Sequence, residues 1–70
     1  MFEKYYTNEA PDQDGHDYLE TSTVDAWGVK LFVVEFNGKQ DAYKSKAAAI
    51  RRRDALIQKY SLTEATEKAY

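Results

Sequence analysis

Cysteine is absent from this chain of 70 residues, and proline, methionine, tryptophan and histidine occur once each. Without cysteine the protein has neither disulfides nor thiolate ligands for zinc, so packing, a ligand or another chain must stabilise the fold. Seventy residues form one small domain, in which the free energy gained by burying the core only slightly exceeds the entropy cost of ordering the chain. We therefore expect a single domain, residues 1–70, with a tendency to self-associate.

Long apolar runs are also absent. No run approaches the roughly 20 apolar residues needed to cross a bilayer, and the first ten residues, MFEKYYTNEA, contain no basic leader followed by an apolar stretch. We expect a soluble, cytoplasmic protein with no membrane partner. The apolar fraction of 43% and the lack of low-complexity segments predict that the chain folds.

Few residues are suited to catalysis or to holding a cofactor. His16 is the one histidine, no serine is bracketed by glycines, and Gly15, Gly28 and Gly38 lie too far apart to form a phosphate-binding loop. Residues 12–17, DQDGHD, lack the sixth-position glycine and distal glutamate of a calcium-binding EF-hand, so we interpret them as a solvated loop. We expect a protein that is not an enzyme, with no catalytic residue, metal, cofactor or small-molecule substrate.

Charge is divided unevenly along the chain, although the net charge is only -2. Residues 1–25 carry seven acidic side chains and one lysine, whereas residues 26–60 carry eight basic and three acidic side chains. An acidic surface is suited to a basic groove on another protein, and a basic surface is suited to a phosphate backbone. The asymmetry therefore indicates two classes of partner.

A β-hairpin is predicted over residues 27–44, WGVKLFVVEFNGKQDAYK. Asn37-Gly38 is typical of a type I′ turn, which joins strands at residues 28–36 and 39–44. A two-residue loop predicts four cross-strand pairs: Phe36 with Lys39, Val34 with Asp41, Phe32 with Tyr43, and Val33 with Ala42.

Both faces of this hairpin carry apolar side chains. Because Ala42 is small, it favours close approach of a helix on its own face of the sheet. We therefore expect the helix to lie over Val29, Leu31 and Val33. The opposite face then needs another cover for its aromatic side chains.

An amphipathic helix is predicted over residues 45–60, with Ser45 as its N-cap. Its apolar stripe has helical spacing and consists of Ala49, Ile50, Leu56, Ile57 and Tyr60. Arg53 projects from the middle of this stripe, where burying it alone would be very costly. We expect it to pair with an acidic residue of the N-terminal segment, namely Glu3, Asp17, Glu20 or Asp25.

The two ends of the chain complete the predicted fold. Residues 1–26 form an acidic segment in which residues 2–6 and 18–24 are predicted strands. Ser61-Leu62-Thr63-Glu64 has the pattern of a capping box and predicts a short helix over residues 61–70. The fold class is α+β: a three- or four-stranded antiparallel sheet with one amphipathic helix packed on one face and a short C-terminal helix.

Two candidate sites follow. A protein-binding site would use an aromatic sheet face, an acidic surface, or both: Phe32, Phe36, Tyr43, Glu9, Asp12, Asp14, Asp17 and Glu20. A nucleic-acid-binding site would use the basic helix face: Arg51, Arg52, Lys59, Lys44 and Lys46.

The sequence pI of about 5.3 lies far below the value of about 9 that is typical of nucleic-acid-binding domains. We therefore favour a small protein-binding module, an adaptor or inhibitor of the kind that compact phage and bacterial genomes encode. Its partner is another protein or a second copy of the chain. Binding of nucleic acid is the alternative.

Residues 27–56 resemble the three-strand-plus-helix module of AP2 domains and of the arm-binding domains of phage-type integrases. The resemblance lies in the order of hairpin, aromatic residue, Ser-Lys and alanine-rich helix. It implies a three-stranded antiparallel sheet beside one helix. It also implies DNA reading by basic and aromatic strand residues, for which this chain offers Lys30 and Lys39 but also Glu35 and Asp41.

Overall fold

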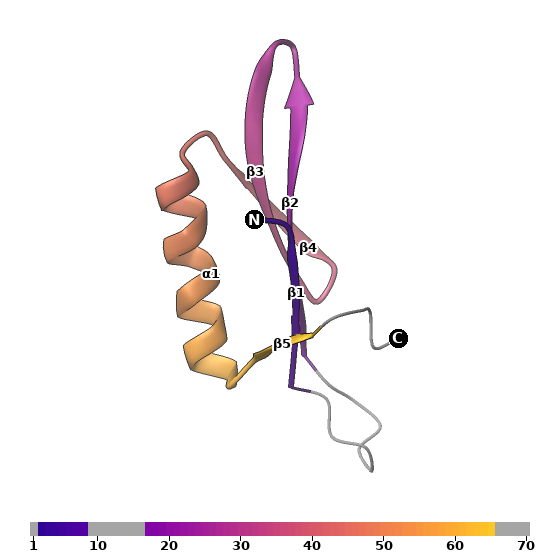
Figure 1. Ribbon diagram of the computed structural model, residues 1–70, viewed down its shortest axis with the longest axis vertical. Coiled ribbons are helices and arrows are strands. Elements are labelled where there is room, and N and C mark those ends of the chain that lie inside the picture. The colour runs from indigo at the N-terminus through magenta and orange to yellow at the C-terminus, as the bar shows by residue number, and fades with distance from the viewer. Residues whose placement is uncertain (1, 9–16, 66–70) are drawn as a thin grey trace.

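The computed structural model describes residues 2–8 and 17–65. These residues form an α+β fold in which one helix lies along one face of a five-stranded antiparallel sheet (Figure 1). The elements are β1 (Lys4–Thr7), β2 (Tyr18–Ala26), β3 (Val29–Phe36), β4 (Lys39–Tyr43), α1 (Lys46–Tyr60) and β5 (Thr63–Ala65). The strand order is β4-β3-β2-β1-β5, so α1 carries the chain from one edge of the sheet to the other.

The predicted β3–β4 hairpin is confirmed. Asn37 and Gly38 have φ angles of 51° and 87°, and two consecutive positive angles define a type I′ turn. The register matches the prediction at all four pairs: Phe36 with Lys39, Val34 with Asp41, Phe32 with Tyr43, and Val33 with Ala42.

The limits of α1 agree closely with the predicted helix. Ser45 is extended and its hydroxyl accepts a hydrogen bond from the Ala48 backbone N–H at 3.4 Å, as an N-cap does. At the other end Ser61 adopts the left-handed conformation (φ 54°), and the Leu62 N–H donates to the Ile57 carbonyl at 3.0 Å. This bond satisfies a terminal carbonyl and ends the helix in a Schellman-type motif.

The predicted C-terminal helix is wrong for the residues that the structure describes, and the predicted three or four strands become five. Ser61 ends α1 and is not the cap of a new helix, because its left-handed backbone is unlike the extended backbone of an N-cap. Leu62 is buried, and Thr63–Ala65 pairs antiparallel with β1. Residues 66–70 lie outside the described residues.

The helix covers the face of the sheet opposite to the predicted one. The rings of Phe36 and Tyr60 lie 4.7 Å apart, and Leu19 and Val34 are almost completely buried on the same face. The pairing of β3 with β2, and of β2 with β1, places large apolar side chains on this face. The helix packs against them and not against the face of the small Ala42. The buried core consists of Phe2, Tyr6, Leu19, Val34, Ala49, Leu56 and Leu62.

The other face of the sheet carries no helix in the described part of the chain, and we call it the helix-free face. Because side chains alternate along a strand, the register assigns every second residue of β2, β3 and β4 to it. These residues are Tyr18, Glu20, Ser22, Val24, Ala26, Val29, Leu31, Val33, Glu35, Gln40 and Ala42.

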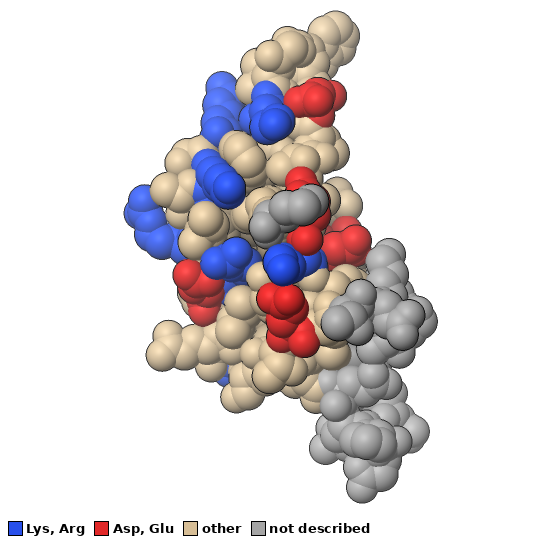
Figure 2. All heavy atoms as spheres, in the orientation of Figure 1, with Lys and Arg blue, Asp and Glu red and all other residues tan. Residues whose placement is uncertain are grey.

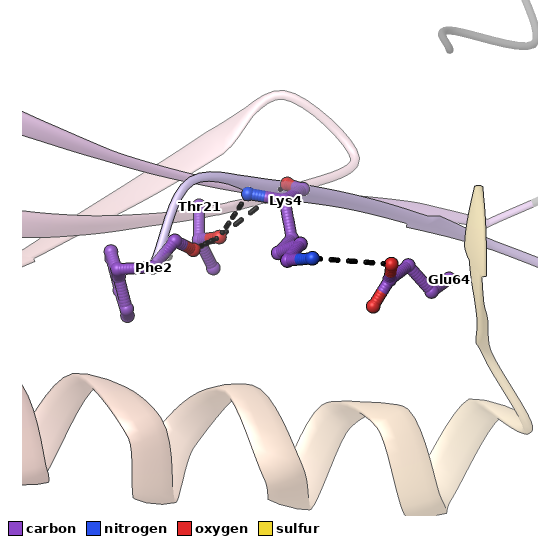
Figure 3. A network of polar contacts seen from close by, with 4 residues as sticks. All are labelled: Phe2, Lys4, Thr21 and Glu64. Carbon is purple, nitrogen blue, oxygen red and sulfur yellow. Dashed lines mark hydrogen bonds and ion pairs between the residues drawn. The ribbon is translucent and has the colours of Figure 1, made fainter. Parts of the chain in front are cut away.

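Thr21 is a polar residue within the core, with only 2% of its surface exposed. Its Oγ1 accepts a hydrogen bond from the Lys4 N–H at 2.9 Å and donates one to the Phe2 carbonyl (Figure 3). With its carbonyl held by Thr21, Phe2 places its ring edge-on to that of Phe32, and the two ring centroids lie 5.6 Å apart. Lys4 Nζ also lies 3.3 Å from Glu64 Oε2, which links β1 to β5.

Candidate functional site

The hairpin of β2 and β3 projects beyond the rest of the sheet (Figure 1). β1 pairs with β2 only at residues 18–21, and β4 pairs with β3 only at residues 32–36. Residues 24–31 therefore form a two-stranded ribbon, which we call the ribbon tip. The molecule is accordingly elongated, at 44 × 21 × 21 Å. In the described structure the ribbon tip has no third strand beside it, so the rest of the sheet supports it only through β2 and β3.

Trp27 occupies the end of the ribbon tip and is fully exposed, with a relative accessible surface of 102%. With Gly28 it forms the turn, at φ angles of 54° and 78°. A left-handed backbone costs roughly 1–2 kcal/mol for a residue other than glycine, asparagine or aspartate. The indole is also solvated, so tryptophan at this position has neither a conformational nor a burial advantage in the folded chain.

Apolar side chains continue from Trp27 along the helix-free face. Val24 and Val29 are 46% and 43% exposed, and they are the other large apolar side chains that are well exposed among the described residues. Ala26 is the cross-strand neighbour of Val29, and Leu31 is that of Val24; both are half-buried. By register Val24, Ala26, Val29 and Leu31 share one face, and Trp27 lies at the turn beyond them. We call these five residues the ribbon-tip patch. Exposed apolar residues grouped in this way are typical of interaction sites.

Charged side chains lie on the other face of the ribbon. Asp25 and Lys30 are cross-strand neighbours with opposite charge. Further along β2, the Thr23 hydroxyl donates to Glu3 Oε2 at 2.7 Å. This hydrogen bond, helped by a backbone bond and by the charge of Lys30, lowers the pKa of Glu3 below its ordinary value of 4.5. Glu3 and Asp25 thus place two carboxylates on this face of the ribbon, beside Lys30.

The three predicted aromatic binding residues lie beneath α1 and not on an open face. All three are half-buried and pack against the core: Phe32, Phe36 and Tyr43. The expectation that this face needs a cover other than the helix is wrong, because α1 itself packs against it. The exposed aromatic residue of this sheet is Trp27.

The predicted acidic surface is only partly within the described residues. Glu9, Asp12 and Asp14 lie outside them. Asp17 contributes to the fold, because its carboxylate accepts hydrogen bonds from Asn8 and Asn37. Glu20 is half-buried on the helix-free face.

The predicted basic residues are all exposed: Arg51, Arg52, Lys59, Lys44 and Lys46. Figure 2 shows basic side chains on the α1 side of the molecule with acidic side chains among them. The displayed face therefore has no continuous basic surface of the kind that follows a phosphate backbone.

Arg53 pairs with its neighbour Asp54, and not with the N-terminal segment as predicted. Arg53 Nη2 and Nε lie 2.9 Å and 3.0 Å from Asp54 Oδ1. The side chain of Arg53 is 21% exposed, so its apolar part lies along the protein while its head reaches a surface carboxylate. The pairing prediction is wrong because Asp54 is adjacent in the sequence, so Arg53 reaches it without any long-range contact.

The sequence pattern did not predict the ribbon tip, although Trp27-Gly28 is a signal for it. Trp27-Gly28 separates two β-prone runs by two residues, which is the spacing of a two-residue hairpin. Tryptophan is untypical at the first turn position, where asparagine, aspartate or glycine is usual. The sequence pattern therefore predicts the start of a strand at residue 28 and not a turn.

The described residues contain no group of three or more histidine, cysteine, aspartate or glutamate side chains placed to hold a metal ion. His16 lies outside them. Among the described residues, no helix is long and apolar enough to cross a membrane. Comparison with protein-family models, curated proteins and solved structures finds no match. The resemblance to AP2 and integrase arm-binding modules stays a prediction.

Proposed function

We propose that this protein is a small non-enzymatic binding module whose ribbon-tip patch docks onto another protein. The observation that carries the proposal is the full exposure of Trp27 at a left-handed turn. Tryptophan is among the residues that contribute most to protein–protein affinity, and it buries roughly 150–250 Å² when its site closes. A partner pocket gives this tryptophan the burial that its own fold does not.

The chemistry of the helix-free face favours protein over nucleic acid as the partner. In β2, β3 and β4, no lysine or arginine belongs to this face. Lys30 and Lys39 both belong to the α1 side. A sheet face that reads DNA needs cations for the phosphates, whereas protein interfaces have apolar, aromatic centres.

Site-specific photocrosslinking tests this proposal. A diazirine-bearing amino acid replaces Val29 in one variant and Ala55, which is exposed on α1, in the control. In lysate of the source cells, position 29 is expected to cross-link to a protein and position 55 is not. Excess wild-type protein should compete, whereas excess Trp27→Asn should not. Equal labelling from both positions, or no labelled protein from position 29, would reject the proposal.

Nucleic-acid binding by α1 is the second candidate, because all five predicted basic residues are solvent-exposed. It predicts binding of DNA or RNA that weakens steeply between about 50 mM and about 200 mM salt. Fluorescence anisotropy with labelled duplex DNA, single-stranded DNA and RNA measures this. Arg52→Glu with Lys59→Glu should abolish such binding, and Trp27→Asn should not alter it.

A further inference from the structure

The outer edge of β2 is unpaired along the ribbon. β1 reaches only to Thr21, so in the described structure residues 23–26 have β3 as their one neighbouring strand. Such edges usually carry lysine, proline or a bulge that discourages pairing. This edge has the sequence Thr-Val-Asp-Ala in unbroken register; it contains no lysine, proline or bulge, and its one charged side chain is Asp25.

The register identifies which backbone groups the edge offers. The Asn37 N–H donates to the Tyr18 carbonyl at 3.1 Å, so even-numbered residues of β2 bond to β3. In an antiparallel pair the intervening residues direct their N–H and C=O outward. Thr23 and Asp25 therefore present outward donors and acceptors, and the chemistry that matches them is another extended backbone.

The side chains beside this edge specify the added strand further. Val24 and Ala26 lie on the helix-free face and match apolar side chains. Asp25 lies on the other face, where the carboxylate of Glu3 is hydrogen-bonded to Thr23. A strand with alternating apolar and basic residues satisfies both faces at once.

A second copy of the chain fits this edge poorly. In a symmetric antiparallel pairing centred on Val24, Asp25 of one copy lies opposite Thr23 of the other. Thr23 holds Glu3, so two carboxylates meet on each side of the axis, with the one lysine Lys30 beside them. Like charges placed across a strand pair are destabilising, which favours a different, basic chain.

Resting on the proposed function, we infer that the partner docks by adding an extended strand with alternating apolar and basic residues to the β2 edge at residues 23–26. Backbone hydrogen bonds at Thr23 and Asp25 align the strand. Basic side chains of the partner then meet Asp25 and Glu3, while its apolar side chains extend the ribbon-tip patch.

Synthetic peptides test this mode through backbone amide signals in nuclear magnetic resonance. The probe is acetyl-Val-Lys-Val-Lys-Val-Lys-amide, and the charge control replaces every lysine with glutamate. The lysine peptide is expected to shift the amide resonances of Thr23 and Asp25 and to slow their hydrogen exchange at least tenfold. The glutamate peptide should do neither.

N-methylation separates strand addition from simple charge attraction. In the inferred pairing the lysine residues lie opposite Thr23 and Asp25, so methyl groups on the lysine amides should abolish binding. Methyl groups on the valine amides point away from β2 and should leave binding intact. Equal effects of the two methylated peptides, equal effects of the lysine and glutamate peptides, or no shift at residues 23–26 would overturn the inference.

The outcomes also distinguish this inference from the proposed function. If position 29 cross-links to a protein but the peptides do not bind the edge, the partner binds the patch in another way and strand addition is wrong. If the lysine peptide binds as expected but position 29 labels no protein, the edge accepts a strand and the proposed function fails.

Discussion

Asn37 Nδ2 donates a hydrogen bond to Asp17 Oδ1 at 2.9 Å, and this contact joins the β3–β4 turn to the start of β2. Asn8 Nδ2 donates to the other oxygen of the same carboxylate at 3.1 Å and to the Tyr60 carbonyl at 2.9 Å. Asp17 therefore connects the turn to Asn8, and Asn8 in turn connects to the end of α1. Asp17 is a structural residue within a segment that otherwise has the composition of a solvated loop.

Removing this carboxylate is expected to destabilise the fold. Asp17→Ala removes one acceptor from each of two side-chain amides and should lower the free energy of unfolding by about 2 kcal/mol. Chemical denaturation followed by circular dichroism measures the change. Asp25→Ala, at an exposed position, should remain within about 0.5 kcal/mol of wild type. Equal losses in the two variants would contradict a structural role for Asp17.

The hydroxyl of Thr21 provides a second test of the fold. Thr21→Val keeps the size of the side chain but leaves the Lys4 N–H and the Phe2 carbonyl without this partner in a buried site. The expected loss in the free energy of unfolding is about 2 kcal/mol. Thr21→Ser retains the hydroxyl and should lose less than Thr21→Val. The reverse order in thermal unfolding would show that the methyl group matters more than the hydrogen bonds.

Glu3 makes stability depend on acid pH in a defined direction. Its folded-state pKa lies below the ordinary 4.5, mainly because Thr23 donates to it, so the stability it adds is complete above pH 4.5. That contribution is lost as the pH falls through the folded-state pKa. The stability difference between wild type and Glu3→Gln should therefore shrink below pH 4.5. A difference that is constant from pH 7 to pH 3 would exclude this linkage.

The elements that the sequence predicted correctly depend on local signals. Asn37-Gly38 determines the β3–β4 register because a two-residue turn leaves only one way to pair the strands. Ser45 and the alanine-rich run determine the start of α1 in the same local way. β5 is different, because three residues form a strand only where β1 already offers an edge, and no local pattern encodes that edge.

The covered face of the sheet and the candidate site required the three-dimensional structure. β3 is apolar on both sides, so alternation alone did not choose the face for α1. Leu19 and Phe2 decide it, and both come from other parts of the chain. The exposed position of Trp27 was not predicted, because it depends on a left-handed turn in which tryptophan is an unusual residue.

Relief of that turn strain is expected to stabilise the protein. Asparagine tolerates the left-handed conformation, and Asn-Gly is the most favoured type I′ pair. Trp27→Asn should raise the free energy of unfolding by about 1 kcal/mol and the midpoint of thermal unfolding by roughly 4–8 °C. Differential scanning calorimetry measures the shift, and Trp27→Val, which keeps a poorly tolerated residue, should not show it. A lower midpoint for Trp27→Asn would mean that the indole stabilises the fold.

The role of Trp27 in binding is tested most directly by quantitative affinity capture from lysate of the source cells. Wild type, Trp27→Asn and Arg52→Glu/Lys59→Glu serve as baits. If the ribbon-tip patch is the binding site, at least one protein is recovered on wild type and on the charge-reversed bait but falls about 30-fold or more on Trp27→Asn, as for a hot-spot tryptophan. Recovery of the same proteins at the same levels on wild type and Trp27→Asn would show that the patch is not the binding site.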